Sequence, residues 1–200
     1  FVYVSEAGGV FAATPDDDEP ERMGTVVVPP GDTIALVSPV LGGTRLVVAG
    51  SEFQALLDLE GKLLHQTTFT SARDVPVPDS AWQCIPIGGG EVFEALVDAE
   101  TGDVVADLQR SEVDEISATG CGVELQRGST RSIVTVAADG PATAVLPPST
   151  RSASLSPDGR QAVVIDNVGR AELILVDESD GSSDPVDLGE LRGAVVLTDR

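Results

Sequence analysis

The chain has 200 residues, of which 42% are hydrophobic, and this is enough apolar material for one domain with a buried core. It carries 33 acidic and 12 basic residues, a formal net charge of −21, and a field of this sign repels phosphate backbones and anionic lipid surfaces. Composition therefore argues against a nucleic-acid partner, and the sequence has no apolar run of about 18 residues that would span a membrane.

Glycine and proline, 21 and 13 residues, are spread along the whole chain and favour many short elements joined by tight turns. A unit of about 40 residues recurs, as is typical of repeat architectures. Its clearest marker is an apolar run that enters an acidic or glycine-containing turn, which is found at Leu57, Val97, Val136 and Val176.

Taken in chain order, the amino-terminal stretch predicts strands at 1–5, 9–14 and 24–29, with an acidic insertion at 14–21. Four complete copies of a four-strand unit follow, at 33–69, 74–109, 113–147 and 152–188. Their predicted strands are 33–39, 44–50, 54–59 and 62–69 in the first copy; 74–79, 81–87, 91–98 and 103–109 in the second; 113–119, 121–127, 131–137 and 141–147 in the third; and 152–158, 160–166, 170–177 and 182–188 in the fourth. The carboxy-terminal run GAVVLTDR predicts one more strand at 193–198.

Four antiparallel strands in about 40 residues have the size of one propeller blade. The sequence therefore predicts an all-β fold: a five-bladed β-propeller over 1–200 as a single domain, with a closing blade shared between 193–198 and 1–29. Sharing that blade would remove two exposed sheet edges. The alternative is that the 200 residues are an excerpt of a longer propeller.

The fourth copy contains the motif SPDGR, Ser156 to Arg160, just before its second predicted strand, and Ser38-Pro39 with Gly42-Gly43 is a partial match. Over residues 152–181 the chain resembles the propeller repeat of TolB-like and other WD40-like bacterial proteins, as found in exported actinobacterial propeller domains. The resemblance implies a propeller that serves as a docking or ligand-binding module, often as the ectodomain of a lipoprotein or membrane protein. The motif itself is turn chemistry and signals a fold rather than an active site.

The sequence gives little support for a metal site or a catalytic site. The one histidine, His65, falls in a predicted outer strand and has no histidine or cysteine pair at ligand spacing. The acidic insertion lacks the spaced pattern of a calcium loop, so we interpret it as solvated, with a bound cation as the alternative. There is no G-x-S-x-G motif. We predict no metal, no cofactor, no catalytic residue and no enzymatic activity.

A glycoside hydrolase is the enzymatic alternative, because some five-bladed propellers place paired carboxylates around a central cavity. One Trp, one Tyr and five Phe, together with compact turns, disfavour it. The carboxylates that would line such a cavity are Asp32, Asp74, Asp114 and Glu115.

The two cysteines, Cys84 and Cys121, fall in the second strands of neighbouring copies. Equivalent positions of adjacent blades lie near each other, so a disulfide between blades is predicted, with two buried thiols as the alternative. A disulfide would favour an extracytoplasmic location, with an upstream segment as anchor. Trp82 beside them is interpreted as packing between blades, or as an exposed anchor for a partner.

The loops that lead into the first strand of each copy carry mixed arginine and carboxylate side chains, which suit a protein partner or a polar ligand at one propeller face. The alternative is that these charges only keep the loops soluble. We predict a monomeric, non-enzymatic binding module, or else a site for a small molecule or carbohydrate at the central mouth. The predicted binding residues are Asp32, Arg73, Asp74, Arg110, Glu112, Asp114, Arg151 and Arg192.

Overall fold

The fold is given by a computed structural model of the chain, in which the described residues are 1–16, 18–69, 78, 81–89, 92–107, 115–118, 121–137, 140–176 and 186–190. These residues form eighteen β-strands, and the single helical element among them is a 3-10 turn, η1 (Leu41–Gly43). The predicted all-β class is confirmed for the described part of the chain.

The strands form five antiparallel sheets, and within each sheet the strands follow one another in chain order. The first sheet contains β1 (Val2–Val4), β2 (Gly9–Ala12) and β3 (Glu21–Thr25); the second contains β4 (Leu36–Val40), β5 (Arg45–Ala49), β6 (Phe53–Asp58) and β7 (Leu63–Thr68); the third contains β8 (Cys84–Gly89), β9 (Val92–Asp98) and β10 (Val104–Asp107). The fourth sheet contains β11 (Glu115–Ala118), β12 (Gly122–Arg127), β13 (Thr130–Ala137) and β14 (Gly140–Val145); the fifth contains β15 (Thr150–Leu155), β16 (Gln161–Asp166), β17 (Arg170–Leu175) and β18 (Val186–Glu190).

Each observed strand overlaps a strand range predicted from the sequence. One shift has a clear cause: β3 begins at Glu21 rather than at residue 24, because Phe11 and Ala12 of β2 pair with Arg22 and Glu21. The β2–β3 hairpin therefore extends into the acidic insertion, whose remaining described residues form its turn. The predicted strands at 74–79 and 193–198 lie outside the described residues, apart from Pro78.

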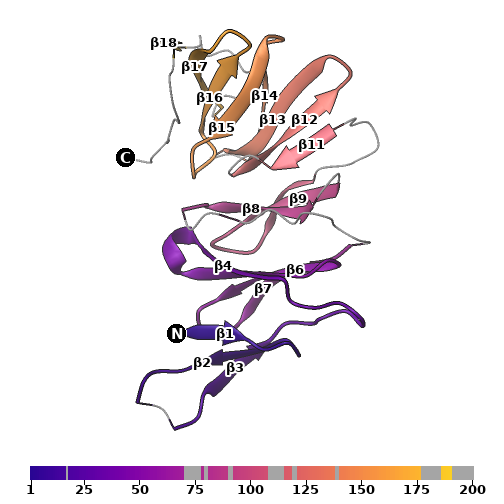
Figure 1. Cartoon of the computed structure of the whole chain (residues 1–200), viewed down its shortest axis with the longest axis vertical. Helices are drawn as coiled ribbons and strands as arrows, with labels where there is room; N and C mark the ends of the chain where they lie inside the picture. The colour runs from indigo at the N-terminus through magenta and orange to yellow at the C-terminus, as the bar shows by residue number, and fades with distance from the viewer. Residues whose placement is uncertain are drawn as a thin grey trace.

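The first three sheets succeed one another along the longest axis of the molecule, and the fourth and fifth lie side by side at one end of it (Figure 1). Four separate apolar clusters lie between them, one at each junction of neighbouring sheets. The first junction packs Val10 against Val48 and Phe53, and the last packs Ile133 against Val164. Burial of apolar surface between facing sheets therefore stabilises the row, and each sheet depends on its neighbours for its core.

In the second sheet, the inner strand β6 is an almost continuous apolar run. All five residues from Phe53 to Leu57 are buried, because neighbouring sheets cover both faces of β6. The run includes one polar side chain, Gln54, which is 1% exposed. Its amide nitrogen donates to the carbonyl of Pro86 at 3.3 Å, and its amide oxygen accepts from the backbone N–H of Gly88 at 3.2 Å, so the buried amide joins the second sheet to the third.

The described strands form an open row rather than a closed ring, because the first and fifth sheets lie at opposite ends of it (Figure 1). Among the described strands, β1 lies at one edge of the first sheet and pairs only with β2. Phe1 and Ala13 exchange two backbone hydrogen bonds of 2.8 and 3.0 Å. Since such pairs alternate along an antiparallel ladder, the peptide groups of Val2 and Val4 point away from β2.

Candidate functional site

The two ends of the sheets have different chemistry. Strands are counted here within the predicted four-strand unit. One end of each sheet, which we call the loop end, has the loop before the first strand and the turn between the second and third strands. The opposite end, which we call the turn end, has the turn between the first and second strands. The predicted binding residues precede the predicted first strands in the sequence. Of the eight, Asp32 and Arg151 are described, and the other six lie outside the described residues: Arg73, Asp74, Arg110, Glu112, Asp114 and Arg192.

At the loop end of the second sheet, Asp32 bonds to its own chain. One carboxylate oxygen accepts hydrogen bonds from the backbone N–H of Thr33 at 2.8 Å and from the N–H and hydroxyl of Ser51 at 3.1 and 2.9 Å. The other accepts from the N–H of Glu52 at 2.7 Å. Desolvation raises the pKa of Asp32, but these four hydrogen bonds outweigh it and hold the pKa below its ordinary value. Asp32 thus ties the loop before β4 to the β5–β6 turn, a role that the sequence did not indicate.

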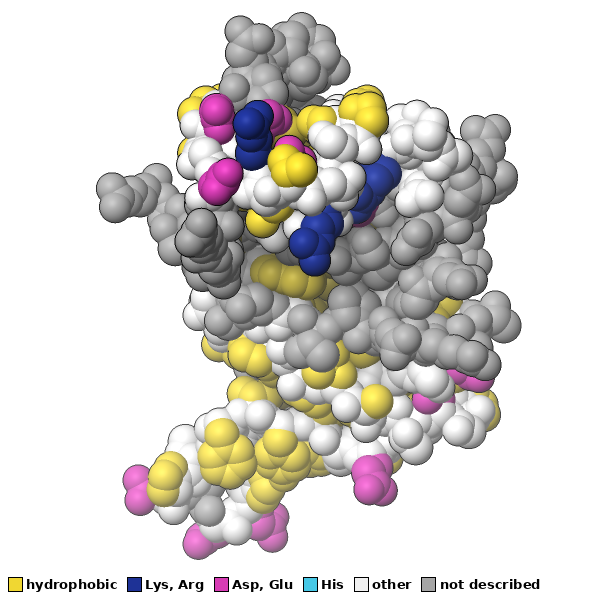
Figure 2. All heavy atoms as spheres, turned by 45° about the horizontal axis from the view of Figure 1, so that its top comes forward, with side chains coloured by type: hydrophobic (Ala, Val, Ile, Leu, Met, Phe, Trp, Pro, Cys, Tyr) yellow, Lys and Arg dark blue, Asp and Glu magenta, His cyan; other side chains and the backbone are white. Residues whose placement is uncertain are grey.

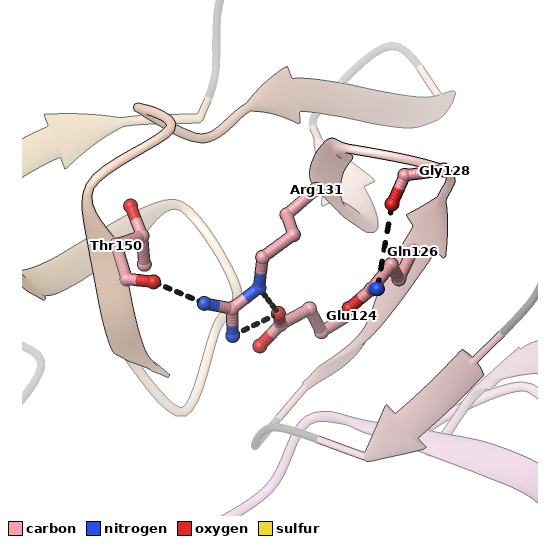
Figure 3. Close-up of polar contacts among 5 residues, drawn as sticks. All are labelled: Glu124, Gln126, Gly128, Arg131 and Thr150. Carbon is pink, nitrogen blue, oxygen red and sulfur yellow. Dashed lines mark hydrogen bonds and ion pairs between the residues drawn. The ribbon is translucent and has the colours of Figure 1, made fainter.

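At the loop end of the fifth sheet, an arginine from the neighbouring sheet holds the incoming loop (Figure 3). The half-buried guanidinium of Arg131 on β13 forms an ion pair with Glu124 on β12 and donates to the carbonyl of Thr150. In addition, the backbone N–H of Asn167 donates to the carbonyl of Ser149, and the N–H of Thr150 donates to the carbonyl of Pro147, both at 3.0 Å. The loop before β15 is therefore fixed by both its own sheet and the fourth one.

Next to this anchored loop lies a cavity of about 50 Å³, which we call the polar notch. It is lined by Pro147, Ser149, Thr150, Val164, Asp166, Arg170 and Glu172. One oxygen of Asp166 accepts the N–H groups of Val168 and Arg170 at 2.8 and 2.9 Å and so shapes the β16–β17 turn. Figure 2, in which the fifth sheet is turned toward the viewer, shows basic and acidic side chains interspersed at this end of the molecule. Arg151 is exposed at the start of β15.

The charges of the notch are not paired with one another. Within the described part of the chain, neither Arg170 nor Glu172 forms an ion pair. Thr150 is 6% exposed, and its side-chain hydroxyl has no hydrogen-bond partner among the described residues. A buried hydroxyl without a partner is costly to the folded chain. None of the notch residues was predicted, although Ser149 and Thr150 immediately precede the predicted Arg151.

At the turn end, Cys84 and Cys121 form the predicted disulfide, with their Cα atoms 5.0 Å apart. Both cysteines are buried, and the bridge joins the third sheet to the fourth. The hydroxyl of Thr135, fully buried on β13, donates to the carbonyl of Cys121. The alternative of two free thiols is therefore wrong.

The SPDG turn packs directly on this bridge. Gly159 has a φ of +76°, and a Cβ at this position would lie 2.1 Å from the Thr135 hydroxyl oxygen and 2.9 Å from the carbonyl oxygen of Cys121. The carbonyl of Pro157 accepts a 3.1 Å hydrogen bond from the N–H of Gln83. A turn of the fifth sheet therefore contacts both the third and the fourth sheets.

The second sheet joins the same assembly, since the N–H of Leu41 donates to the carbonyl of Trp82 at 3.0 Å. We call these meeting turns the turn hub; it comprises residues 41–44, 81–84, 121 and 156–160. Trp82 is half-buried within it. The hub is thus bonded internally by the disulfide and by backbone hydrogen bonds between its turns.

The remaining candidates for metal binding or catalysis are His65 and the four carboxylates considered for glycoside hydrolysis. The described residues contain no group of three or more His, Cys, Asp or Glu side chains that could hold a metal ion. His65 lies on the outer strand β7, half-buried, and its Nδ1 is 3.2 Å from the carbonyl oxygen of Gly102 in the third sheet. Of the four carboxylates considered for glycoside hydrolysis, Asp32 is bonded as described and Glu115 begins β11, whereas Asp74 and Asp114 lie outside the described residues.

No helix in the described part of the chain has the length and apolar character needed to cross a bilayer. No protein-family model and no curated protein sequence matches the chain. Solved structures do match. The chain is similar to a eukaryotic initiation factor, with 13% identity and a TM-score of 0.48, covering 98% of this chain and 53% of that one.

Two further matches are a chain of the mitotic checkpoint complex (16% identity, TM-score 0.41, 88% of this chain and 59% of that one) and a functionally unknown protein from Desulfotomaculum acetoxidans (14% identity, TM-score 0.40, 94% and 64%). The chain thus spans between about half and two-thirds of the length of these solved chains.

Proposed function

We propose that the protein is a non-enzymatic interaction module that binds a protein partner at its loop end. The observation that carries this proposal is the polar notch, whose charged side chains are not paired with one another. A partner residue can use such groups without first breaking internal bonds, which lowers the cost of binding. Arg151 beside the notch belongs to the same surface.

The size of the notch supports a protein partner over a free ligand. Sites for small molecules are usually cavities of about 300–1,000 Å³ that enclose most of the ligand. The notch, at about 50 Å³, has room for one head group of a side chain but not for a sugar ring. At the notch, a carbohydrate or another small molecule is therefore less well supported than a side chain of a protein.

Site-specific photo-crosslinking tests this proposal. A photoreactive amino acid replaces Arg151 at the loop end or, as a control, Lys62, which is exposed in the β6–β7 turn of the second sheet. In cells of the source organism, we expect one reproducible crosslinked protein from position 151 and none from position 62. Equal crosslinking from both positions, or none from position 151, would overturn the proposal.

We further propose that the five sheets are blades of a WD40-like propeller and that 193–198 adds to β1 as the shared closing strand. The edge of β1, which pairs only with β2 among the described residues, supports this. Because the described sheets form an open row, closure requires the row to curve until its ends meet. Hydrogen exchange at the N–H groups of Val2 and Val4 tests it: closure predicts protection, whereas rapid exchange of both contradicts it.

The disulfide supports an extracytoplasmic location, because disulfides persist mainly in oxidising compartments. We propose a monomer on the outer side of a bacterial membrane, anchored through an upstream segment. Thiol trapping in intact cells should find Cys84 and Cys121 oxidised, and light scattering of the purified protein should give the mass of a single chain. Free thiols in the cell would contradict the location.

A further inference from the structure

We propose that the SPDG turn, residues 156–159, is a gate over the disulfide. While the turn is seated on the fourth sheet, a thiol does not reach the Cys84–Cys121 bridge, and reduction occurs only when the turn has moved away. The redox state of the bridge is thereby coupled to the seating of a turn of the fifth sheet. This inference concerns the turn hub and does not depend on the proposed binding function of the loop end.

The bridge is closed to solvent in the folded chain. Cys84 is 2% exposed and Cys121 is 1% exposed. A thiolate reduces a disulfide by attacking one of its sulfur atoms, so the rate depends on access to that atom. Because both cysteines are this deeply buried, the folded chain must open before the exchange can begin.

The SPDG turn covers the Cys121 side of the bridge. A Cβ added at Gly159 would lie 3.3 Å from the Sγ of Cys121 and 2.9 Å from its carbonyl oxygen. Leu155, which ends β15 just before the turn, also packs closely, since a Cβ added at Gly122 would lie 2.6 Å from its Cδ1. The turn and the residue that enters it therefore contact Cys121 and the residue after it, and contribute to the burial of the sulfur.

The same turn is tied to the chain next to Cys84. The N–H of Gln83 donates to the carbonyl of Pro157 at 3.1 Å. The turn therefore spans both halves of the bridge, because it packs on Cys121 and is bonded beside Cys84.

The turn holds its shape through its own hydrogen bonds, so it can move as one unit. The carboxylate of Asp158 accepts the hydroxyl of Ser156 and, at 3.0 Å, the N–H of Arg160. The N–H of Gln161 donates to the Ser156 hydroxyl oxygen at 3.0 Å, and the N–H of Gly159 donates to the Ser156 carbonyl at 2.9 Å. These bonds are kept when the turn moves away from Cys121, so opening requires less than global unfolding.

Reduction by a dithiol such as dithiothreitol takes two steps once the turn is open. A thiolate of the reagent attacks one cysteine sulfur, the disulfide bond breaks, and the other cysteine leaves as a thiolate that takes up a proton. The second thiol of the reagent then attacks the mixed disulfide, which releases the first cysteine and forms the cyclic oxidised reagent. Two electrons pass from the reagent to the bridge, and the protein is left with two thiols.

The experiment follows reduction of the folded, oxidised protein by dithiothreitol at neutral pH, with oxidised glutathione as an exposed disulfide for comparison. Samples are quenched with iodoacetamide at intervals, and mass spectrometry counts the alkylated cysteines. We expect the bridge to be reduced at least about a hundredfold more slowly than glutathione. Urea below the unfolding transition should change the rate only weakly, because the opening of one turn exposes little surface.

One variant opens the gate without touching the cysteines. Asp158→Ala removes the carboxylate that closes the turn and should raise the reduction rate about five- to tenfold. Asp58→Ala is the matched control, because Asp58 is also a half-buried aspartate that accepts a turn N–H, from Lys62 at 2.8 Å, but lies in the second sheet. It should leave the rate unchanged. Urea unfolding of each variant separates local opening from a general loss of stability.

Three results would overturn the inference. Reduction of the wild-type bridge as fast as that of oxidised glutathione would show that the bridge is not covered. Equal acceleration by Asp158→Ala and Asp58→Ala, or none by Asp158→Ala, would show that the SPDG turn is not the gate. A rate that rises with urea as steeply as global unfolding would show that the whole chain, rather than the turn, must open.

Discussion

The turn hub and the loop end differ in how far the chain satisfies its own polar groups. In the turn hub, a disulfide, a positive-φ glycine and backbone hydrogen bonds join turns from four sheets. At the loop end of the fifth sheet, charged groups and a buried hydroxyl remain without partners in the described residues. The hub therefore holds the sheets together through its own bonds, whereas the notch has the unpaired charges that the proposed binding surface requires.

The loop end is itself not uniform. In the second sheet, Asp32 accepts four hydrogen bonds from its own chain; in the fifth sheet, Glu172 forms no ion pair. Both are carboxylates at the loop end of a four-stranded sheet, yet only the second has capacity left for a partner. Charge at a loop end is therefore a weak indicator of binding unless the hydrogen bonds of each group are known.

Removal of the disulfide should have the largest effect on stability. The bridge closes a loop between residues 37 apart, and the chain-entropy model gives about 3–4 kcal/mol for a loop of this length. The double variant Cys84→Ser, Cys121→Ser should unfold at clearly lower urea concentration than the oxidised protein. Reduced wild-type protein is the control and should behave like the variant; stability equal to that of the oxidised form would contradict a structural role for the bridge.

A glycine substitution in the hub should be nearly as costly. Gly159→Ala places a Cβ within 2.9 Å of the Cys121 carbonyl oxygen and requires a φ of +76°. Gly128→Ala is the matched control, because its φ is +59° but no atom lies within 4 Å of the added Cβ. We expect about 1 kcal/mol of destabilisation for the control, from backbone strain, and about 2–4 kcal/mol for Gly159→Ala. Thermal unfolding of the two variants measures the difference, and equal losses would mean that the SPDG turn does not pack on the bridge.

The carboxylate of Asp32 should contribute less, and its contribution should depend on pH. Asp32→Ala leaves the N–H groups of Thr33, Ser51 and Glu52 without their acceptor, which should cost about 1–3 kcal/mol at neutral pH. Because the pKa of Asp32 is lowered by folding, the stabilisation is complete above the ordinary carboxyl pKa of about 3.9 and is lost as the pH falls through the lower folded value.

Denaturant unfolding of wild type and Asp32→Asn between neutral pH and pH 3 measures this dependence. The gap in stability between the two proteins should narrow below about pH 4, in the window given by the lowered pKa. Glu60→Asn, in an exposed turn, serves as a control for the general effect of charge. A gap that stays constant with pH would show that the ionised carboxylate of Asp32 is not what stabilises the loops.

The repeat made much of this fold predictable, and long-range geometry explains what was missed. Alternating apolar residues between turn residues marked the strands, and the equivalent positions of Cys84 and Cys121 in adjacent copies indicated their pairing. The start of β3 was missed because pairing with β2, rather than apolar character, places Glu21 and Arg22 in a strand. The contact of Pro157 with Gln83 and the bonding of Asp32 depend on how separate segments meet, which strand patterns do not encode.

Two buried threonines allow the same substitution at both ends of the sheets, with the smallest expected effects. Thr135 in the hub is fully buried, and its hydroxyl donates to the Cys121 carbonyl; Thr150 in the notch is nearly as buried, and its hydroxyl has no described partner. Thr135→Val removes a made hydrogen bond and leaves a carbonyl unpaired, so it should destabilise by about 1–2 kcal/mol. Thr150→Val replaces an unpartnered hydroxyl by a methyl group and should change stability by less than about 0.5 kcal/mol. If the two variants lose equal stability in urea unfolding, the Thr150 hydroxyl is satisfied within the folded chain, and the distinction between a self-bonded hub and an available notch does not hold.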